Sequence, residues 1–163
     1  HDSVGSAPGN PGEARAEHHI LSAIFARQVL TEEGWAEERI QAVEHCIRAH
    51  RFRNKGEKPH TLEAQALFDA DKLDVLGAIG AARTIAYAAL DGQPSYAEPS
   101  QQFLETGVKQ PGEPHSSYHE YLFKLRRVKD LLFTHTGRQI AEQRDAFLRA
   151  FYEQLQAECH GER

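Results

Sequence analysis

Methionine is absent from the sequence, and so is any long apolar run. The chain begins with His1 and Asp2, so we expect that it is not a complete translation product. No apolar stretch approaches the roughly 20 residues needed to span a bilayer, and no signal peptide is visible. These absences predict a cytoplasmic protein without a membrane segment.

Cysteine is scarce, and no region is dominated by positive charge. Cys46 and Cys159 lie far apart and form no metal-type pair, so we interpret them as reduced thiols. The 163 residues carry 19 lysines and arginines against 24 aspartates and glutamates, which gives a net charge of −5. Because there is neither a basic stripe nor a polybasic tail, we expect no nucleic-acid partner and no binding to a membrane surface.

The sequence does contain apolar residues at the spacing typical of helices. Apolar residues recur at spacings of three and four over five segments, which are separated by glycine, proline or charge. The predicted helices cover residues 14–30, 36–50, 61–89, 116–133 and 137–158. Residues 91–115 are rich in proline and glycine and are predicted to form a long irregular connection. No alternating strand pattern is present, so we predict one all-α domain over residues 1–163.

Two of these helices carry more specific signals. Thr61 is a suitable N-cap for the third helix, with Glu63 in its first turn. That helix is apolar on more than one face, which is typical of a helix in the middle of a bundle. On the last helix, the buried side is expected to carry Ile140, Phe147, Phe151 and Leu155.

Three polar groups fall on faces that helical geometry predicts to be buried. Successive residues of a helix are rotated by about 100° around its axis. By this geometry His18 lies at the start of the apolar face of the first helix, and His50 lies at the end of the apolar face of the second helix. Asp71 shares a face with Leu67 and Val75. A single histidine on an apolar face is usually a core residue with satisfied hydrogen bonds. Three such groups together with the His1–Asp2 pair favour a site for zinc, iron or manganese, which prefer imidazole and carboxylate ligands.

Several blocks of sequence appear in the order of a known family. They are "HD" at 1–2, "EHHILSA" at 17–23, "AVEHCIRAH" at 42–50, "DADKLDVLGAIGAAR" at 69–83 and the segment at 116–155. In these blocks the chain resembles the HD superfamily of metal-dependent phosphohydrolases, and most closely the small bacterial stand-alone HD-domain hydrolases. The "HD" dipeptide alone is a weak signal, whereas the block at 69–83 is fairly specific.

The resemblance implies an HD-domain-like helical bundle that holds one or two divalent ions of manganese, iron, cobalt, nickel or zinc. Carried over by position, it implies five metal ligands: His1, Asp2, His18, His50 and Asp71. His19 is the alternative to His18 if the register of "EHH" differs by one residue. The family has a further histidine on a helix upstream of the HD pair, so we expect that this chain lacks its N-terminal helix.

The resemblance also implies a reaction. A metal-bound hydroxide held near Asp2 would release phosphate from a nucleotide or another small phosphorylated metabolite. Lys72 is a candidate catalytic residue, and Lys72, Arg83 and Arg51 are candidates for binding the phosphate of the substrate. For Lys72 and Arg83, solvation or a nearby acidic partner is the stronger explanation, and Arg83 is the better candidate of the two. For Arg51, a solvated charged loop is an equally good explanation.

Two other functions are compatible with the same residues. Some HD relatives with two irons are oxygenases, and the five candidate ligands would permit a two-metal site. Alternatively, the chain is a non-catalytic, nucleotide-binding regulatory module on the same scaffold, a reading that the missing upstream histidine supports.

Overall fold

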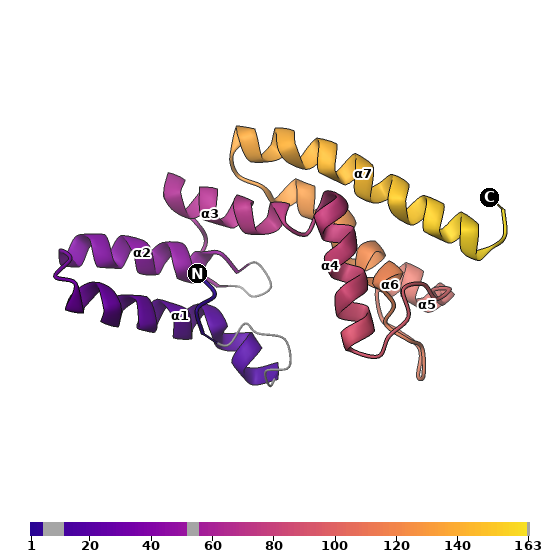
Figure 1. The fold of residues 1–163 in the computed structure, drawn as a ribbon, viewed down its shortest axis with the longest axis horizontal. Coiled ribbons are helices and arrows are strands. Elements are labelled where there is room, and N and C mark those ends of the chain that lie inside the picture. Colours follow the sequence, from indigo (N-terminus) through magenta and orange to yellow (C-terminus); the bar gives the residue numbers. More distant parts are fainter. Residues whose placement is uncertain (5–11, 52–55, 163) are drawn as a thin grey trace. The chain divides into compact units, whose positions relative to one another are not determined.

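A computed structural model describes residues 1–4, 12–51 and 56–162, with residues 12–16 described by their backbone alone. The described residues form seven α-helices and one 3₁₀ helix without any strand (Figure 1), which confirms the all-α prediction. The helices are α1 (Gly12–Glu32), α2 (Glu37–Ala49), α3 (Leu62–Leu73), α4 (Gly77–Leu90), α5 (Gln101–Thr106), α6 (Ser117–Phe123), η1 (Leu125–Leu131) and α7 (His135–Cys159). Within this part of the chain, no single helix is long and apolar enough to cross a membrane, although the bent pair α3 and α4 passes that test together.

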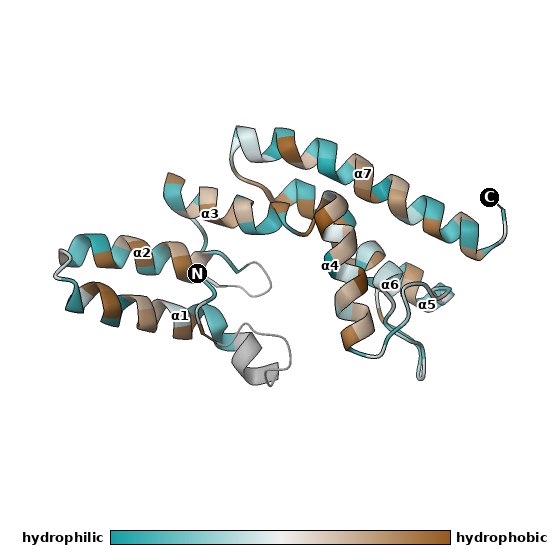
Figure 2. Cartoon of the chain, in the orientation of Figure 1, coloured by the Kyte–Doolittle hydropathy of each residue, from teal (hydrophilic) through white to brown (hydrophobic). Residues whose placement is uncertain are grey.

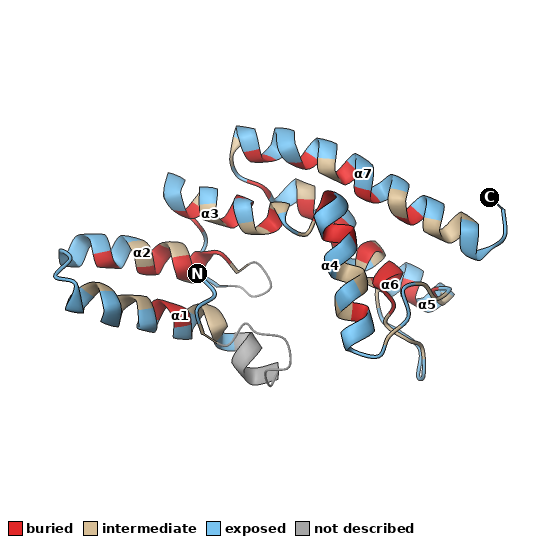
Figure 3. Ribbon diagram, in the orientation of Figure 1, coloured by how far each residue is buried: buried red, intermediate tan, exposed pale blue. Residues whose placement is uncertain are grey.

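The chain divides into two compact units, His1–Asp71 and Lys72–Arg163, and the boundary falls near the end of α3. Each unit has its own buried residues (Figure 3) and is described separately below. The expectation of one domain over 1–163 stays a prediction.

The first unit is built on the pairing of α1 with α2. The turn between them is closed by hydrogen bonds such as that from the Trp35 N–H to the Leu30 carbonyl at 3.0 Å. Ile40 and Ile47 of α2, whose spacing puts them on one helical face, are buried. Arg27 of α1 ties the two helices together at the edge, because its guanidinium group contacts both Glu37 and Glu44 of α2.

Helix α3 starts where the sequence predicts. The hydroxyl of Thr61 accepts a hydrogen bond from the Ala64 N–H at 3.2 Å, which satisfies one of the free donors of the first helical turn. Ala64 and Phe68 are buried on one side of this helix, while Leu62 stays exposed. Thr61 is therefore confirmed as the N-cap.

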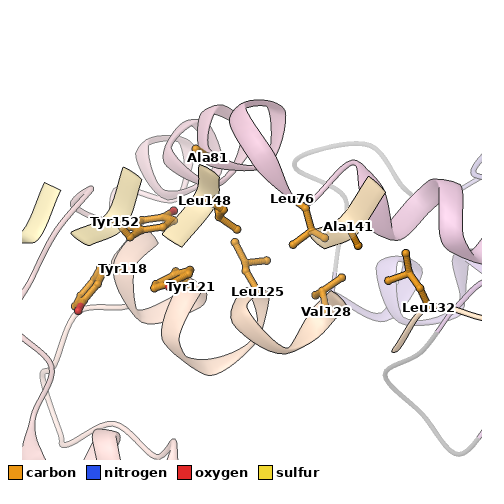
Figure 4. Packing of buried hydrophobic residues seen from close by; sticks show 10 residues of the cluster. All are labelled: Leu76, Ala81, Tyr118, Tyr121, Leu125, Val128, Leu132, Ala141, Leu148 and Tyr152. Atoms are coloured by element: carbon orange, nitrogen blue, oxygen red, sulfur yellow. The ribbon is translucent and has the colours of Figure 1, made fainter. Parts of the chain in front are cut away.

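The core of the second unit is aromatic at one end and aliphatic at the other. The rings of Tyr121 and Tyr152 stack with centroids 4.5 Å apart, and Tyr118 lies beside both. Figure 4 shows the cluster, to which α4, α6, η1 and α7 contribute. Its members are Leu76, Ala81, Tyr118, Tyr121, Leu125, Val128, Leu132, Ala141, Leu148 and Tyr152.

The buried side of α7 differs from the prediction. Ile140 and Phe147 are exposed, while Phe151 and Leu155 are half-buried. The stripe that packs into the core is offset from them and consists of Gly137, Ala141, Asp145, Leu148 and Tyr152. Phe151 and Leu155 do pack against the core cluster, so the prediction is right for these two residues and wrong for Ile140 and Phe147. The reason is that α7 carries apolar residues on two neighbouring faces.

The predicted helix over 61–89 is in fact two helices, α3 and α4, bent by 65° at a short break. Both carry many apolar residues (Figure 2), and no glycine or proline interrupts the sequence between them until Gly77, which made them look continuous. The carbonyl of Leu73 at the end of α3 accepts hydrogen bonds from the Leu76 N–H at 3.3 Å and from the Arg144 guanidinium at 2.7 Å. Gly77, the first residue of α4, has a left-handed conformation with φ of +68°, which glycine adopts without strain.

Two other predicted boundaries also change. The helix expected over 116–133 is α6 followed by the tighter η1, with the change at Lys124, which has φ of −124°. The connection expected over 91–115 contains the short helix α5, which Ser100 caps by accepting a hydrogen bond from the Phe103 N–H. The short helix α5 thus depends on a local cap rather than on apolar periodicity.

The bend between α3 and α4 predicts the effect of one substitution. A methyl group added at Gly80 would lie 2.2 Å from the Val75 carbonyl oxygen, so the backbone of the bend would have to move. We expect Gly80→Ala to lower the free energy of unfolding by about 3 kcal/mol, the upper range for overpacking. The measurement is urea unfolding followed by circular dichroism.

Gly92→Ala is the control. Gly92 has φ of +66° and open space around it, so the same change should cost about 1 kcal/mol from backbone conformation alone. Equal losses for both variants would contradict a tightly packed bend.

Candidate metal centre

The N-terminal pair is held against α1 by a buried serine. The Ser22 hydroxyl accepts a hydrogen bond from the Val4 N–H at 3.1 Å and lies 3.4 Å from the Val4 carbonyl, to which it donates. Ser22 is fully buried. One side chain thus fixes both backbone polar groups of Val4, two residues after Asp2, and so positions the His1–Asp2 pair.

The carboxylate of Asp2 contacts three imidazoles. Its Oδ1 atom lies 3.4 Å from His18 Nε2 on α1 and 3.3 Å from His50 Nε2, the residue directly after α2. Its Oδ2 atom lies 3.4 Å from His1 Nε2. The fold therefore brings together groups that are up to 49 positions apart in the sequence, and they converge on one point.

The hydrogen bonding of His50 identifies which of its nitrogens faces this point. His50 Nδ1 lies 2.5 Å from the Ile47 carbonyl oxygen, which can only accept, so Nδ1 carries the proton. Nε2 therefore faces the cluster, where it contacts the Asp2 carboxylate or, in the neutral ring, can offer a lone pair to a metal ion. His50 Nε2 also lies 3.1 Å from His18 Nε2, and two ring nitrogens at that distance are stable when a proton or a cation lies between them.

Asp71 of α3 closes another side of the cluster. Its Oδ1 atom lies 3.7 Å from His1 Nε2, and the rings of His1 and His50 meet edge to face with centroids 4.6 Å apart. Hydrogen bonds to Asp2 and then to Asp71 raise the pKa of His1 to about 9. Hydrogen bonds from His1 and then from His50 hold the pKa of Asp2 far below its usual value. The site therefore favours positive charge.

The structure places His18, rather than His19, against Asp2 and His50. The ring of His19 lies farther from His50 than the ring of His18 does, because the centroid distances are 6.5 Å and 5.2 Å. Burial, and then the nearby charge of Arg51, lower the pKa of His19. Its Nδ1 atom is buried and has no hydrogen-bond partner among the described residues.

The donor set fits a divalent transition metal. One ligand atom each from His1, Asp2 and His50 lies within 4.8 Å of the others, a spacing that a single ion can bridge. Imidazole with carboxylate is the ligand chemistry of zinc, iron, manganese and related ions. These three residues could hold the ion, with His18 and Asp71 beside them.

The three candidate substrate-binding residues have different positions. Arg51 is half-buried and close enough to His19 to affect its pKa, so it belongs to the surroundings of the cluster. Lys72 is buried and begins the second unit. Arg83 is exposed on α4 of that unit, with its guanidinium 5.9 Å from the centre of the Tyr87 ring. The roles of Lys72 and Arg83 stay predictions.

Histidines and aspartates from separate helical segments thus converge on a cluster that could hold a metal ion. Residues 1–76, which contain the whole cluster, match the family model of the HD domain. This part of the chain therefore belongs to the HD-domain family, as the sequence blocks indicated.

Known proteins agree with this assignment. The uncharacterized protein YpgQ from Bacillus subtilis is 33% identical over 131 residues, which cover 78% of this chain and 57% of YpgQ. The crystal structure of YpgQ in complex with ADP matches 91% of this chain and 67% of that chain, with 27% identity and a TM-score of 0.63. A HD-superfamily hydrolase from Bacillus thuringiensis matches 90% of this chain and 64% of its own, with 29% identity and a TM-score of 0.60. The chain thus spans somewhat over half the length of its curated relative.

Ser22 is a functional residue of this site that the sequence did not predict. The feature of the sequence that could have identified Ser22 is its position: it is a small polar residue one turn after His18, on a helix face predicted to be buried. Such residues require hydrogen-bond partners, and here the partner is the backbone next to the His1–Asp2 pair.

Ser22→Ala should therefore weaken metal binding without removing a ligand. Loss of the bonds to Val4 frees the segment that carries Asp2, and we expect manganese or zinc affinity to fall about tenfold, as for other residues that orient ligands. Isothermal titration measures the change. Ser3→Ala, at an exposed position, is the control and should leave the affinity unchanged. Unaltered affinity in the Ser22 variant would show that Val4 does not position the pair.

Proposed function

We propose that this chain is a metal-dependent phosphohydrolase that acts on a nucleotide or another small phosphorylated metabolite. The observation that carries the proposal is the contact of one carboxylate, Asp2, with the imidazoles of His1, His18 and His50. The HD-superfamily hydrolase from Bacillus thuringiensis supports hydrolysis as the class of reaction. The complex of YpgQ with ADP supports a nucleotide as the ligand.

The cluster has a closed side and an open side. The His50 side chain is 3% exposed and His18 is 17% exposed, whereas Asp2 is 39% exposed. Groups on the buried side are suited to holding an ion in place, because their surroundings restrict their movement. The open side, formed by Asp2 with His1 and Asp71, leaves room for a phosphoryl group and a water molecule.

A divalent cation bound here would neutralise phosphoryl oxygens and lower the pKa of a coordinated water. The protein's own part is to position and to move protons. Asp2 is the most exposed acidic group of the cluster and, because its pKa is held low, it is ionised and able to orient the attacking water through a hydrogen bond. Arg51, beside the cluster, would bind another phosphate of the substrate.

Removing one carboxylate should abolish the reaction. We expect Asp71→Ala to lower kcat/KM for a nucleoside diphosphate by at least about 100-fold, since the ion loses a charged group beside His1. Phosphate release with manganese, cobalt, nickel or iron is the measurement. A chelator should abolish the activity, and readdition of the metal should restore it.

Asp91→Ala is the matched control, because Asp91 is exposed at the end of α4 in the second unit. It should retain the full rate. If Asp71→Ala hydrolyses the substrate as fast as the unaltered chain, or if chelation has no effect, the proposed reaction is wrong.

Arg51→Ala tests the assignment of the substrate. A residue that binds a phosphate away from the reacting atoms contributes to ground-state binding, so KM should rise about tenfold while kcat changes little. Arg39→Ala is the control, because its guanidinium lies 4.1 Å from the centre of the Trp35 ring and serves packing. A drop in kcat with unchanged KM would instead place Arg51 among the groups that act in the transition state.

A further inference from the structure

A second group of potential metal ligands lies in the first unit outside the HD centre. His45 is on α2, and Glu57 and His60 belong to the segment that leads into α3. One ligand atom from each of the three lies within 4.8 Å of the other two. His45 and His50 are five positions apart, about 140° around the helix, so the two histidines serve different sites.

The contacts within this group are unusually close. His45 Nδ1 lies 2.5 Å from Glu57 Oε1, shorter than the 2.7–3.2 Å of an ordinary N–H···O hydrogen bond. The rings of His45 and His60 have centroids 3.7 Å apart. Two imidazoles and one carboxylate therefore converge on one point.

The surroundings orient the group. Arg48, one turn after His45, donates from Nε to Glu57 Oε2 at 2.7 Å and leaves Oε1 directed at the His45 ring. His45 itself is 5% exposed, so its ring has little freedom to turn away. A carboxylate fixed by an arginine beside a buried imidazole is a typical arrangement around a bound ion.

We propose that His45, Glu57 and His60 form a binding site for a zinc-class divalent ion, separate from the HD centre. Two histidines and one glutamate are a ligand set that zinc uses, with a fourth position open to water. The His60 backbone N–H donates a hydrogen bond to His45 Nε2 at 3.3 Å, which places the two residues side by side but leaves the rotamer of the exposed His60 side chain unconstrained. The His60 ring nevertheless lies against His45, where its nitrogen can reach the same point as the other two groups. A shared ion accounts for all three.

The position of this site indicates a structural role. It joins α2, which leads into His50, to the segment that leads into α3, which carries Asp71. A bound ion would therefore fix the two elements that deliver these residues to the HD centre. The proposal does not depend on the reaction at that centre.

The test uses zinc alone as the probe and a chain whose HD centre is disabled. Asp2→Asn with Asp71→Asn removes both carboxylates there, and we expect this chain to retain one zinc ion per molecule after dialysis, measured by elemental analysis. Adding His60→Gln should reduce the bound zinc to background. His135→Gln, at an exposed histidine of α7 in the second unit, is the matched control and should leave the ion bound.

Glu57→Gln separates a metal site from a purely hydrogen-bonded clasp, because glutamine keeps the shape and much of the hydrogen bonding but loses the charge. Added to the chain with the disabled centre, it should weaken zinc binding at least tenfold and remove the visible absorption of tetrahedral cobalt bound in place of zinc. Circular dichroism checks that each variant remains helical. Absence of zinc from the Asp2→Asn, Asp71→Asn chain, or unchanged binding after His60→Gln or Glu57→Gln, would overturn the proposal.

Discussion

The contact of the Asp2 carboxylate with three imidazoles is the interaction on which the candidate centre depends. It brings the start of the chain, α1 and the end of α2 to one point, and Asp71 of α3 reaches the same cluster through His1. Ring nitrogens as close as those of His18 and His50 need either a hydrogen-bonding proton or a metal ion between them. The carboxylates supply the field that attracts a positive charge, whether it is a proton or a metal ion.

The elements around the cluster act mainly by restricting its geometry. The Ile47 carbonyl fixes the tautomer of His50, and Ser22 fixes the backbone two residues after Asp2. The pairing of α1 with α2, closed at its edge by Arg27, sets the separation of His18 and His50. Helix α2 therefore has two functions, since one side packs into the first unit and its last turns deliver histidines to two different places.

Helical periodicity and family resemblance together predicted much of this arrangement. The burial of Ile40 and Ile47, the cap at Thr61 and the inward direction of His50 follow from residue spacing in single helices. The choice between His18 and His19 could not be made that way, because neighbouring positions differ by about 100° and both adjoin the apolar face. Contact with Asp2, which is distant in sequence, distinguishes them.

The errors share a physical cause, which is that tertiary contacts override local pattern. The break between α3 and α4 depends on Arg144, which reaches the Leu73 carbonyl from 71 residues farther along the chain. The choice of the buried face on α7 depends on the tyrosine stack that surrounds Tyr152. Helical periodicity could not predict the cluster of His45, Glu57 and His60 either, because Glu57 and His60 lie in a segment without regular structure.

The most direct test of the central claim is anomalous diffraction from crystals grown with manganese. The account predicts a peak at bonding distance, about 2.2 Å, from an Asp2 carboxylate oxygen and from His50 Nε2. Crystals without a peak at this cluster, or with manganese bound elsewhere while Asp2 and His50 remain in direct contact, would contradict it.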